Sequence, residues 1–250
     1  MRAGSSSGSM VRSLGIEEWD GVARDYDRVS QVSRAHQEKF ARVTELVLAE
    51  RPAAVLDLGC GSGLLVRTLR ESGFDGRLEC LDGSSEMLAL AERNVGDGAC
   101  GFGLHDLSQP IPFPDASLGV VTAINVMFCL EDRGAFAREV DRVLLPAGLF
   151  VCVMPKPVTE GTGAFFREHF KGMTAIEATR ESLRLLPTLP AAIRTSRFQS
   201  TLDRRHEQQG DTFMTREETE AVLRGARFSI ERIEDIQANE NWLFAARKSA

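Results

Sequence analysis

The chain has 250 residues, of which 43% are hydrophobic and 26% charged, and its formal net charge is −6. This length suits one domain with a full core, and the acidic balance disfavours general nucleic-acid binding, which relies on basic residues. No apolar run reaches the roughly 18 residues of a membrane span, so we expect a cytoplasmic protein with no nucleic-acid or membrane partner. The Gly/Ser-rich start lacks the apolar core of a secretory signal, and we expect residues 1–15 to be a disordered leader and 16–250 the folded domain.

The cysteines fit neither a metal site nor a disulfide framework. Their number is odd and their spacing matches no zinc pattern, so we expect free thiols in a reducing compartment and no metal. These residues are Cys60, Cys80, Cys100, Cys129 and Cys152.

Helical and strand patterns alternate through the first two thirds of the chain. Two helical patterns, 16–30 and 34–50, come first, and Pro52 ends the second. Helices are then expected between successive strands, because βαβ alternation predicts a parallel sheet with helices on both faces. The expected strands are 54–58, 78–81, 100–104, 118–124 and 149–154, the last opened by Pro146 and Gly148.

The C-terminal part predicts a helix followed by a hairpin. Thr215 and Glu218 have the spacing of a capping box, and the helix they open ends near Gly225. Strands at 228–236 and 241–246 follow, joined by a short polar turn. The last strand must then run antiparallel in an otherwise parallel sheet. We therefore predict an α/β, Rossmann-like sheet of seven strands, six parallel and the last antiparallel.

Residues 156–212 interrupt this rhythm. They contain short helical patterns that Pro187 and Pro190 separate, and they are slightly basic whereas the rest of the chain is acidic. We interpret them as a mostly helical insertion, either a lid over an active site or a dimerisation element. The sequence does not decide between these two roles, and a homodimer is possible.

The segment Asp57–Gly63, DLGCGSG, is the strongest functional signal. It follows an apolar strand and precedes a helix, so it predicts a tight turn that holds a nucleotide-like ligand. A dinucleotide site would need a third glycine at position 64, which is Leu64. Asp57 would repel a pyrophosphate but suits a ligand with a cationic amino group. The pattern therefore favours S-adenosylmethionine over a dinucleotide.

Four segments together resemble the class I S-adenosylmethionine-dependent methyltransferases of the small-molecule type, with a domain like methyltransferase domains 11 and 25. They are DLGCGSG at 57–63, LDGSSEM at 81–87, HDL at 105–107 with IPFPD at 111–115, and AINVMFCLED at 123–132. The resemblance covers 16–155 and 213–248 and leaves the insertion out.

The resemblance implies a set of cofactor contacts. Asp57 and the glycine backbone would hold the methionine end, Asp82 would accept the ribose hydroxyls, and Asp106 with the Leu107 amide would meet the adenine amino group. Met87 would pack on adenine or in the core. The full implied set is Tyr26, Asp57, Gly59, Cys60, Gly61, Asp82, Gly83, Met87, Asp106, Leu107, Ala123 and Asn125.

The catalytic side is less defined. Many relatives place histidines just after the fourth strand, but here those positions are Phe128 and Cys129. A base is needed only when the acceptor carries a proton at working pH, and the candidates are His169, His206 and Tyr26.

We expect methyl transfer to a nitrogen or oxygen of a small-molecule metabolite. The alternatives are a protein or RNA methyltransferase, a non-catalytic S-adenosylmethionine-binding protein, and a dinucleotide-dependent oxidoreductase, which Leu64 and the antiparallel last strand disfavour.

Overall fold

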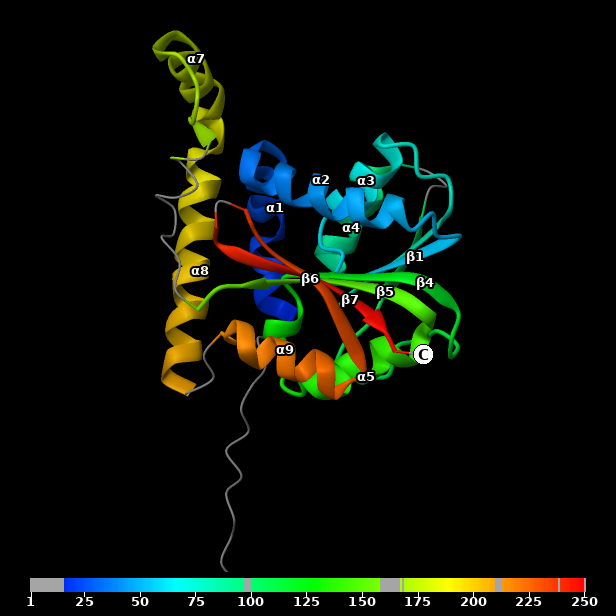
Figure 1. Ribbon diagram of the computed structural model, residues 1–250. Coiled ribbons are helices and arrows are strands. Elements are labelled where there is room, and N and C mark those ends of the chain that lie inside the picture. Colours follow the sequence, from blue (N-terminus) through cyan, green and yellow to red (C-terminus); the bar gives the residue numbers. More distant parts are fainter. Residues whose placement is uncertain are drawn as a thin grey trace, which may run out of the picture.

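The computed structural model describes residues 16–96, 100–157, 167, 169–209, 213–237 and 239–249 (Figure 1). The expected leader at 1–15 lies outside these residues. A seven-stranded sheet forms the centre, in the order β3-β2-β1-β4-β5-β7-β6. Strands β1 to β5 pair in parallel, and β7 pairs antiparallel with both β5 and β6. The predicted sheet of six parallel strands and one antiparallel strand is thus confirmed. The strands are Ala54–Leu58 (β1), Arg77–Asp82 (β2), Gly101–Leu104 (β3), Leu118–Ile124 (β4), Leu144–Pro155 (β5), Phe228–Ile236 (β6) and Asn241–Lys248 (β7).

Helices cover both faces of this sheet (Figure 1). On one face α2, α3 and α4 pack over Val55, Val120 and Val151, and on the other α5 and α9 pack over Leu56, Val121 and Phe150. Neighbouring residues of a strand point to opposite faces, so the continuous apolar runs of the sequence supply both cores. The helices are Ile16–Val32 (α1), Arg34–Ala49 (α2), Leu64–Glu71 (α3), Ser85–Val95 (α4), Arg133–Val143 (α5), Ala175–Leu185 (α7), Leu189–Gln209 (α8) and Arg216–Gly225 (α9), with short 3-10 turns at Met127–Cys129 (η1) and Leu186–Thr188 (η2).

The fifth strand begins earlier than expected. The sequence predicts it from Leu149, but β5 starts at Leu144, directly after α5. Leu144 pairs with the first residue of β4, and the register then shifts so that Leu149 faces Val120. Pro146 lies in this irregular stretch, where a missing ladder donor is tolerated.

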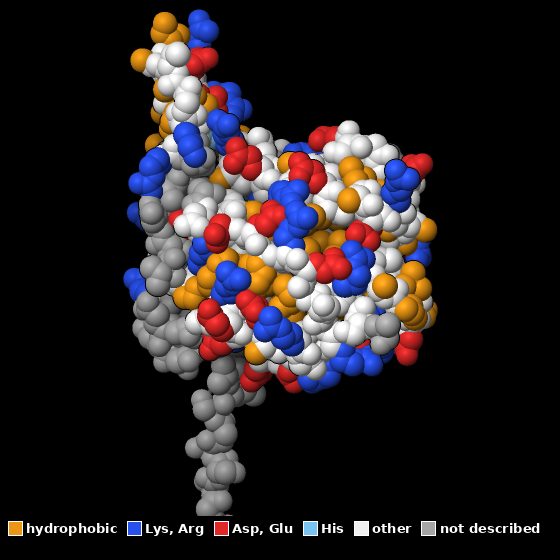
Figure 2. Space-filling model, viewed as in Figure 1, with side chains coloured by type: hydrophobic (Ala, Val, Ile, Leu, Met, Phe, Trp, Pro, Cys, Tyr) orange, Lys and Arg blue, Asp and Glu red, His pale blue; other side chains and the backbone are white. Residues whose placement is uncertain are grey.

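The insertion forms longer helices than expected. Pro190 does not separate two patches, because it lies in the first turn of α8, where proline is compatible with a helix. Helix α8 lies along α1 and α7 extends beyond the body of the molecule (Figure 1). No residue of α7 is buried, and hydrophobic side chains are visible at its tip in Figure 2.

Candidate functional site

The glycine turn is joined to the end of β2. The amides of Gly59 and Cys60 donate to the Leu81 carbonyl at 2.7 and 3.1 Å, and the Gly61 amide donates to Asp82 Oδ2 at 2.8 Å. Gly59 has a φ of +66°, and a Cβ there would lie 2.3 Å from Val126 Cγ2. Gly61 also has a positive φ, but the space its Cβ would enter is open. The turn therefore presents bare backbone to that space, while its amides already have partners.

Two carboxylates lie behind this turn with raised pKa values. Asp57 is 3% exposed and Thr122 Oγ1 donates to its Oδ1 at 2.6 Å. Burial raises the pKa of Asp57 to about 7. The hydrogen bond from Thr122 lowers this pKa, and the negative charge of Asp82 raises it. Burial also raises the pKa of Asp82, although the amides of Ser84 and Gly61 oppose this. A cationic ligand would stabilise both ionised carboxylates.

The ends of β3 and β4 complete the same edge of the sheet. The His105 amide donates to the Asp82 carbonyl at 2.9 Å, which places the following Asp106 and Leu107 beside β2. Asp106 is exposed and accepts from the Ser108 amide at 2.9 Å, so it also forms the turn. After β4, Asn125 has a φ of +55°. Its buried Oδ1 has no hydrogen-bond partner.

Helix α1 covers this edge. Tyr26 lies edge-on to Trp19, with ring centroids 5.9 Å apart, and both pack on a buried cluster of Met87, Ala23 and Leu90 between α1 and α4. Burial raises the pKa of Tyr26, and the negative charge of Asp82 raises it further. The Tyr26 hydroxyl therefore lies within electrostatic reach of the β2 end.

Polar contacts hold α1 in this position. Asp20 accepts from the hydroxyl of Ser84, the N-cap of α4, and Asp27 accepts from Asn94 Nδ2 at 2.9 Å. The same Asn94 group donates to the Ser62 carbonyl of the glycine turn at 3.0 Å. Sequence analysis assigned no role to Asp27 or Asn94, because each is an ordinary polar residue until the fold brings α1, α4 and the turn together.

The expected histidine bases are dispersed. His169 Nε2 lies 2.9 Å from Glu181 Oε1 of α7, and its Nδ1 accepts from the Arg34 amide at the start of α2. His206 belongs to α8, but its side chain lies outside the described residues. Two aromatic side chains of the insertion pack on different partners, since Phe170 packs on His169 and Phe198 packs on Trp19 of α1.

Helix α2 contributes two buried bases that sequence analysis did not single out. His36 lies edge-on to Tyr26, with ring centroids 6.1 Å apart, and Lys39 is 1% exposed. Burial lowers the pKa of both, to about 7 for Lys39. The available signal was a lysine on the apolar stripe that includes Val43 and Val47.

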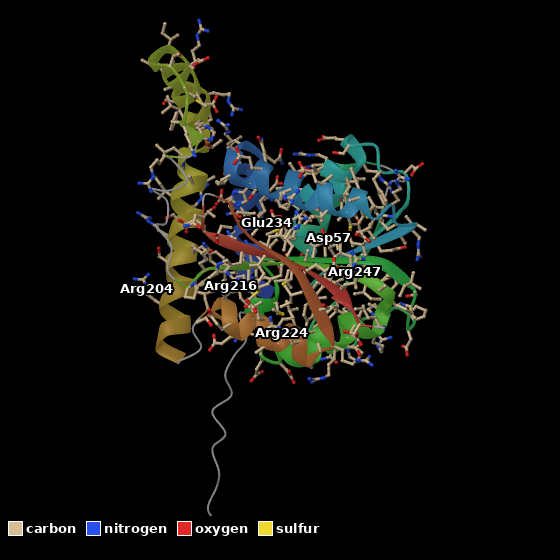
Figure 3. All side chains as sticks on the ribbon, in the orientation of Figure 1. Asp57, Arg204, Arg216, Arg224, Glu234 and Arg247 are labelled. Atoms are coloured by element: carbon tan, nitrogen blue, oxygen red, sulfur yellow. The ribbon has the colours of Figure 1, made fainter. Side chains whose placement is uncertain are left out.

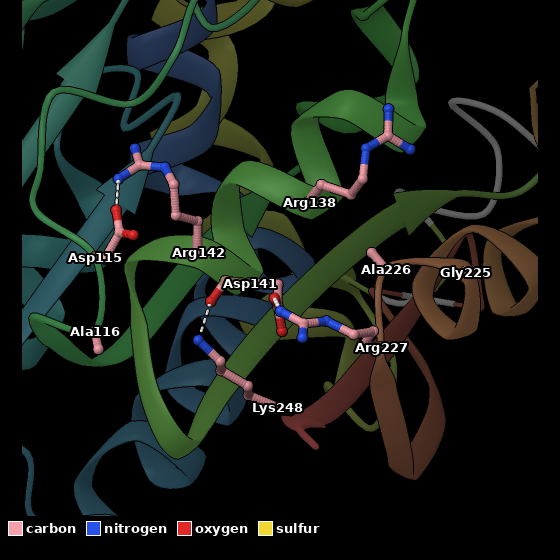
Figure 4. Close-up of a pocket in the computed structure, with 9 residues that line it drawn as sticks. All are labelled: Asp115, Ala116, Arg138, Asp141, Arg142, Gly225, Ala226, Arg227 and Lys248. Atoms are coloured by element: carbon pink, nitrogen blue, oxygen red, sulfur yellow. Dashed lines mark hydrogen bonds and ion pairs between the residues drawn. The ribbon is translucent and has the colours of Figure 1, made fainter. Parts of the chain in front are cut away.

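A cavity of about 460 Å³ lies far from the glycine turn (Figure 4). It is lined by Asp115, Ala116, Asp141 and Lys248, which belong to the opposite edge of the sheet, where β4 begins and β7 ends. Its charges largely satisfy one another, since Arg142 pairs with Asp115 at 2.8 Å and Lys248 Nζ donates to the Asp141 carbonyl. This cavity is therefore no candidate for the ligand of the glycine turn.

The residues at the carboxyl edge fit S-adenosylmethionine better than a dinucleotide. Open space beside Gly61 adjoins the buried carboxylate of Asp57 and the half-buried carboxylate of Asp82, which suit a cationic ligand and oppose a pyrophosphate. Among the described residues no group of three or more His, Cys, Asp or Glu could hold a metal ion. Within the described part of the chain, no helix is both long and apolar enough to cross a membrane.

Comparisons with known proteins agree with this assignment. Residues 56–152 match the methyltransferase domain model Methyltransf_11. The chain is 31% identical to the demethylmenaquinone methyltransferase of Thermotoga maritima over 168 residues, which cover 66% of this chain and 72% of that protein. It is 27% identical to the malonyl-[acyl-carrier protein] O-methyltransferase of Hahella chejuensis, covering 58% of this chain and half the length of that relative.

Solved structures share the fold. Magnesium protoporphyrin IX methyltransferase from Synechocystis, solved with bound S-adenosylhomocysteine, aligns over 94% of this chain and 99% of its own at a TM-score of 0.60 and 15% identity. The motifs, the sheet order and the extent of the Thermotoga match agree. The chain is an enzyme that uses S-adenosylmethionine, and it belongs to the class I S-adenosylmethionine-dependent methyltransferases.

Proposed function

We propose that this enzyme transfers a methyl group to a nitrogen or oxygen of a small-molecule metabolite. The observation that carries the proposal is the meeting of the glycine turn and the ends of β2 and β4 at one edge of the sheet, beneath α1. One relative is named for demethylmenaquinone, which supports a small-molecule acceptor, and the other for O-methylation of malonyl-[acyl-carrier protein], which supports an oxygen acceptor. The net charge of −6 supports the same class over RNA.

The proposed cofactor contacts follow from this placement. Asp57 and the backbone of Gly59, Cys60 and Gly61 would surround the methionine moiety, with Asp57 facing its amino group. Because the Gly59 and Gly61 amides have partners, the turn would offer its carbonyl oxygens and open space rather than N–H donors.

The nucleoside would lie along the next strand ends. Asp82 and Gly83 would face the ribose hydroxyls, and each Asp82 oxygen keeps accepting capacity beyond its one amide partner. The Leu107 amide with Asp106 would face the adenine amino group, with Met87 beneath the ring. Ala123 and Asn125 would border the cofactor from β4.

Methyl transfer also requires that the acceptor atom, the methyl carbon and the sulfur lie in line. Bound S-adenosylmethionine supplies an electrophilic methyl carbon on a sulfonium that is already a good leaving group. The protein must then hold the acceptor in line and exclude water. Tyr26 and α1 would do this by covering the site, and we propose that the insertion extends this cover as a lid, since α8 packs on α1 and Arg194 of α8 pairs with Asp25 of α1.

A release assay for S-adenosylhomocysteine tests the proposal. The panel contains two phenols (catechol, 1-naphthol), two carboxylic acids (benzoic acid, monoethyl malonate), two amines (histamine, tryptamine), total RNA and a mixed protein extract. Release with a small molecule and loss of that release in Asp82→Asn are expected. Release only with RNA or protein would overturn the small-molecule assignment.

A further inference from the structure

Lys39 is an unusual residue for this chain. The sequence contains only four lysines, at 39, 156, 171 and 248, and otherwise uses arginine for positive charge. Lys39 is almost fully buried, and its Nζ has no hydrogen-bond partner. A buried amine without a partner is costly, so its retention in a core position needs an explanation outside folding.

Two ion pairs fix where Lys39 lies. Glu50, just after α2, pairs with Arg247 at 2.9 Å, and Arg247 faces Leu149 near the beginning of β5. Arg42 of α2 pairs with Glu234 near the end of β6 at 2.7 Å. Figure 3 shows Glu234 and Arg247 at separate places along the β6–β7 hairpin. The Arg42 pair therefore places the first half of α2 near the carboxyl edge of the parallel strands, and the Glu50 pair places its end away from that edge. Lys39 is almost one turn before Arg42, so it lies toward the carboxyl edge, where α/β sheets bind ligands.

Other buried polar atoms at this edge also have no partners. They are Asn125 Oδ1 after β4, Gln237 Oε1 after β6 and Asn241 Oδ1 at the start of β7. The Asn125 amide donates to Val153 of β5, and Asn241 pairs with Pro155 two residues further along that strand. Asn125 and Gln237 have positive φ values of 55° and 54°. Unsatisfied atoms and strained backbone in one place indicate a ligand site.

We propose that Lys39 contacts the methyl acceptor and takes the proton from the acidic hydroxyl, such as that of a phenol, whose oxygen is methylated. This inference rests on the proposed function and narrows its acceptor to an acidic oxygen. Lysine serves such a role better than arginine because its amine can lose its proton when buried.

The step balances. The acceptor O–H proton moves to the Lys39 amine, the resulting oxyanion forms a bond to the methyl carbon, and the carbon–sulfur bond breaks with its electrons on sulfur. The proton leaves Lys39 for solvent after the product departs. The groups beside Lys39 are His36 and the Phe40 ring on α2. His36 in turn lies edge-on to Tyr26 of α1, and Arg42, almost one turn after Lys39, pairs with Glu234. Glu240, also buried, lies in the β6–β7 turn.

Lys39→Met is the decisive variant, with Thr44→Val as its matched control. Met has a similar length without the amine, and Thr44 is a second buried residue of α2 whose hydroxyl has no partner. We expect Lys39→Met to fold, to bind S-adenosylmethionine within about twofold of wild type, and to lose about 100-fold or more in kcat/KM with catechol or 1-naphthol. Thr44→Val should keep wild-type kcat/KM.

The pH profile separates this role from a structural one. Only the neutral amine accepts a proton, so at S-adenosylmethionine concentrations that saturate the enzyme at every pH, wild-type kcat/KM for the acceptor should rise with pH through about 7, the pKa of Lys39. Saturation with cofactor removes the contribution of Asp57, whose pKa is also about 7. The Lys39→Met variant should lose this rise. An unchanged profile, or an unchanged kcat/KM with oxygen acceptors, would overturn the inference.

NMR of the lysine side chains tests the contact between Lys39 and an acceptor without depending on methyl transfer. With ¹³Cε-labelled lysine, four signals are expected, and Lys→Arg variants at 156, 171 and 248 assign them. In the presence of S-adenosylhomocysteine, benzoic acid or catechol should move the Lys39 signal and raise its titration midpoint. If no panel member is methylated but the signal responds, the proposed function fails and the Lys39 contact survives. If no acidic probe moves the signal, the contact is refuted.

Discussion

At the scale of single residues, ionisable side chains are buried where a ligand would compensate them. Asp57 and Lys39 are both at most 3% exposed and both have pKa values near 7. Burial penalises the charged form of each group. Among the residues that the structure describes, neither side chain is paired with an opposite charge, which favours ligand binding over stability at these positions.

Asp57 should make cofactor affinity depend on pH. Its pKa is raised by burial to about 7, with Asp82, Cys60 and Cys80 as the titratable groups around it. The ionised form, which faces the cationic ligand, predominates above pH 7. Titration calorimetry from pH 5.5 to 8.5 should therefore show S-adenosylmethionine affinity falling up to about tenfold per unit below pH 7.

The matched variants are Asp57→Asn and Asp115→Asn. The first removes the charge and should bind more weakly at pH 8, by about tenfold or more, with a flatter pH dependence. Asp115 pairs with Arg142 at the opposite edge, so its variant should behave as wild type. Equal pH dependence in Asp57→Asn and wild type would contradict the assignment.

At the scale of elements, two helices begin with the same capping box but differ in what they bury. Thr215 and Glu218 cap α9, whose Thr219 and Leu223 are buried against the core. Thr174 and Glu177 cap α7, which has no buried residue. Capping strength is local, whereas its effect on global unfolding depends on whether the helix is coupled to the core.

Threonine-to-alanine substitutions at the two caps should therefore differ. Thr215→Ala should lower the free energy of unfolding by about 1 kcal/mol, or about 2–4 °C in Tm. Thr174→Ala should leave Tm within about 1 °C, because α7 can fray without exposing the core. Urea and thermal denaturation by circular dichroism measure both, and equal losses would show that α7 unfolds together with the domain.

At the scale of the whole molecule, the two edges of the sheet differ in how fully their polar groups are paired. The carboxyl edge carries the glycine turn, Asp82 and Asn125 with polar atoms left open, whereas the amino edge carries a cavity whose charges are mostly paired. Ligand binding to the native state alone stabilises it by mass action.

S-adenosylhomocysteine at 100 times its Kd should add about 2.7 kcal/mol to stability, seen as a rise in Tm by scanning fluorimetry. Asp82→Asn should reduce this rise at the same concentration. Asp115→Asn, which alters the lining of the amino-edge cavity, should leave it unchanged. Loss of the rise in Asp115→Asn instead would place the cofactor at the amino edge.

Local patterns determined much of this protein. The strand at 54–58 with its glycine turn, the Ser84 cap of α4 and the hairpin that reverses β7 all depend on residues near one another in sequence. Such signals act through backbone sterics and short-range hydrogen bonds, which need no knowledge of the fold. The motif set also indicated the enzyme class and its cofactor.

Tertiary structure decided what those patterns could not. The early start of β5 depends on pairing with β4, and the link from Asn94 to Asp27 and the glycine turn joins three distant segments. In the sequence, Lys39 is one polar residue of an amphipathic helix. Only the packing of α2 on the sheet, fixed by the Arg42 and Glu50 ion pairs, places Lys39 toward the carboxyl edge. Burial and electrostatics are sums over spatial neighbours, so only the folded chain sets the pKa of Lys39 and Asp57.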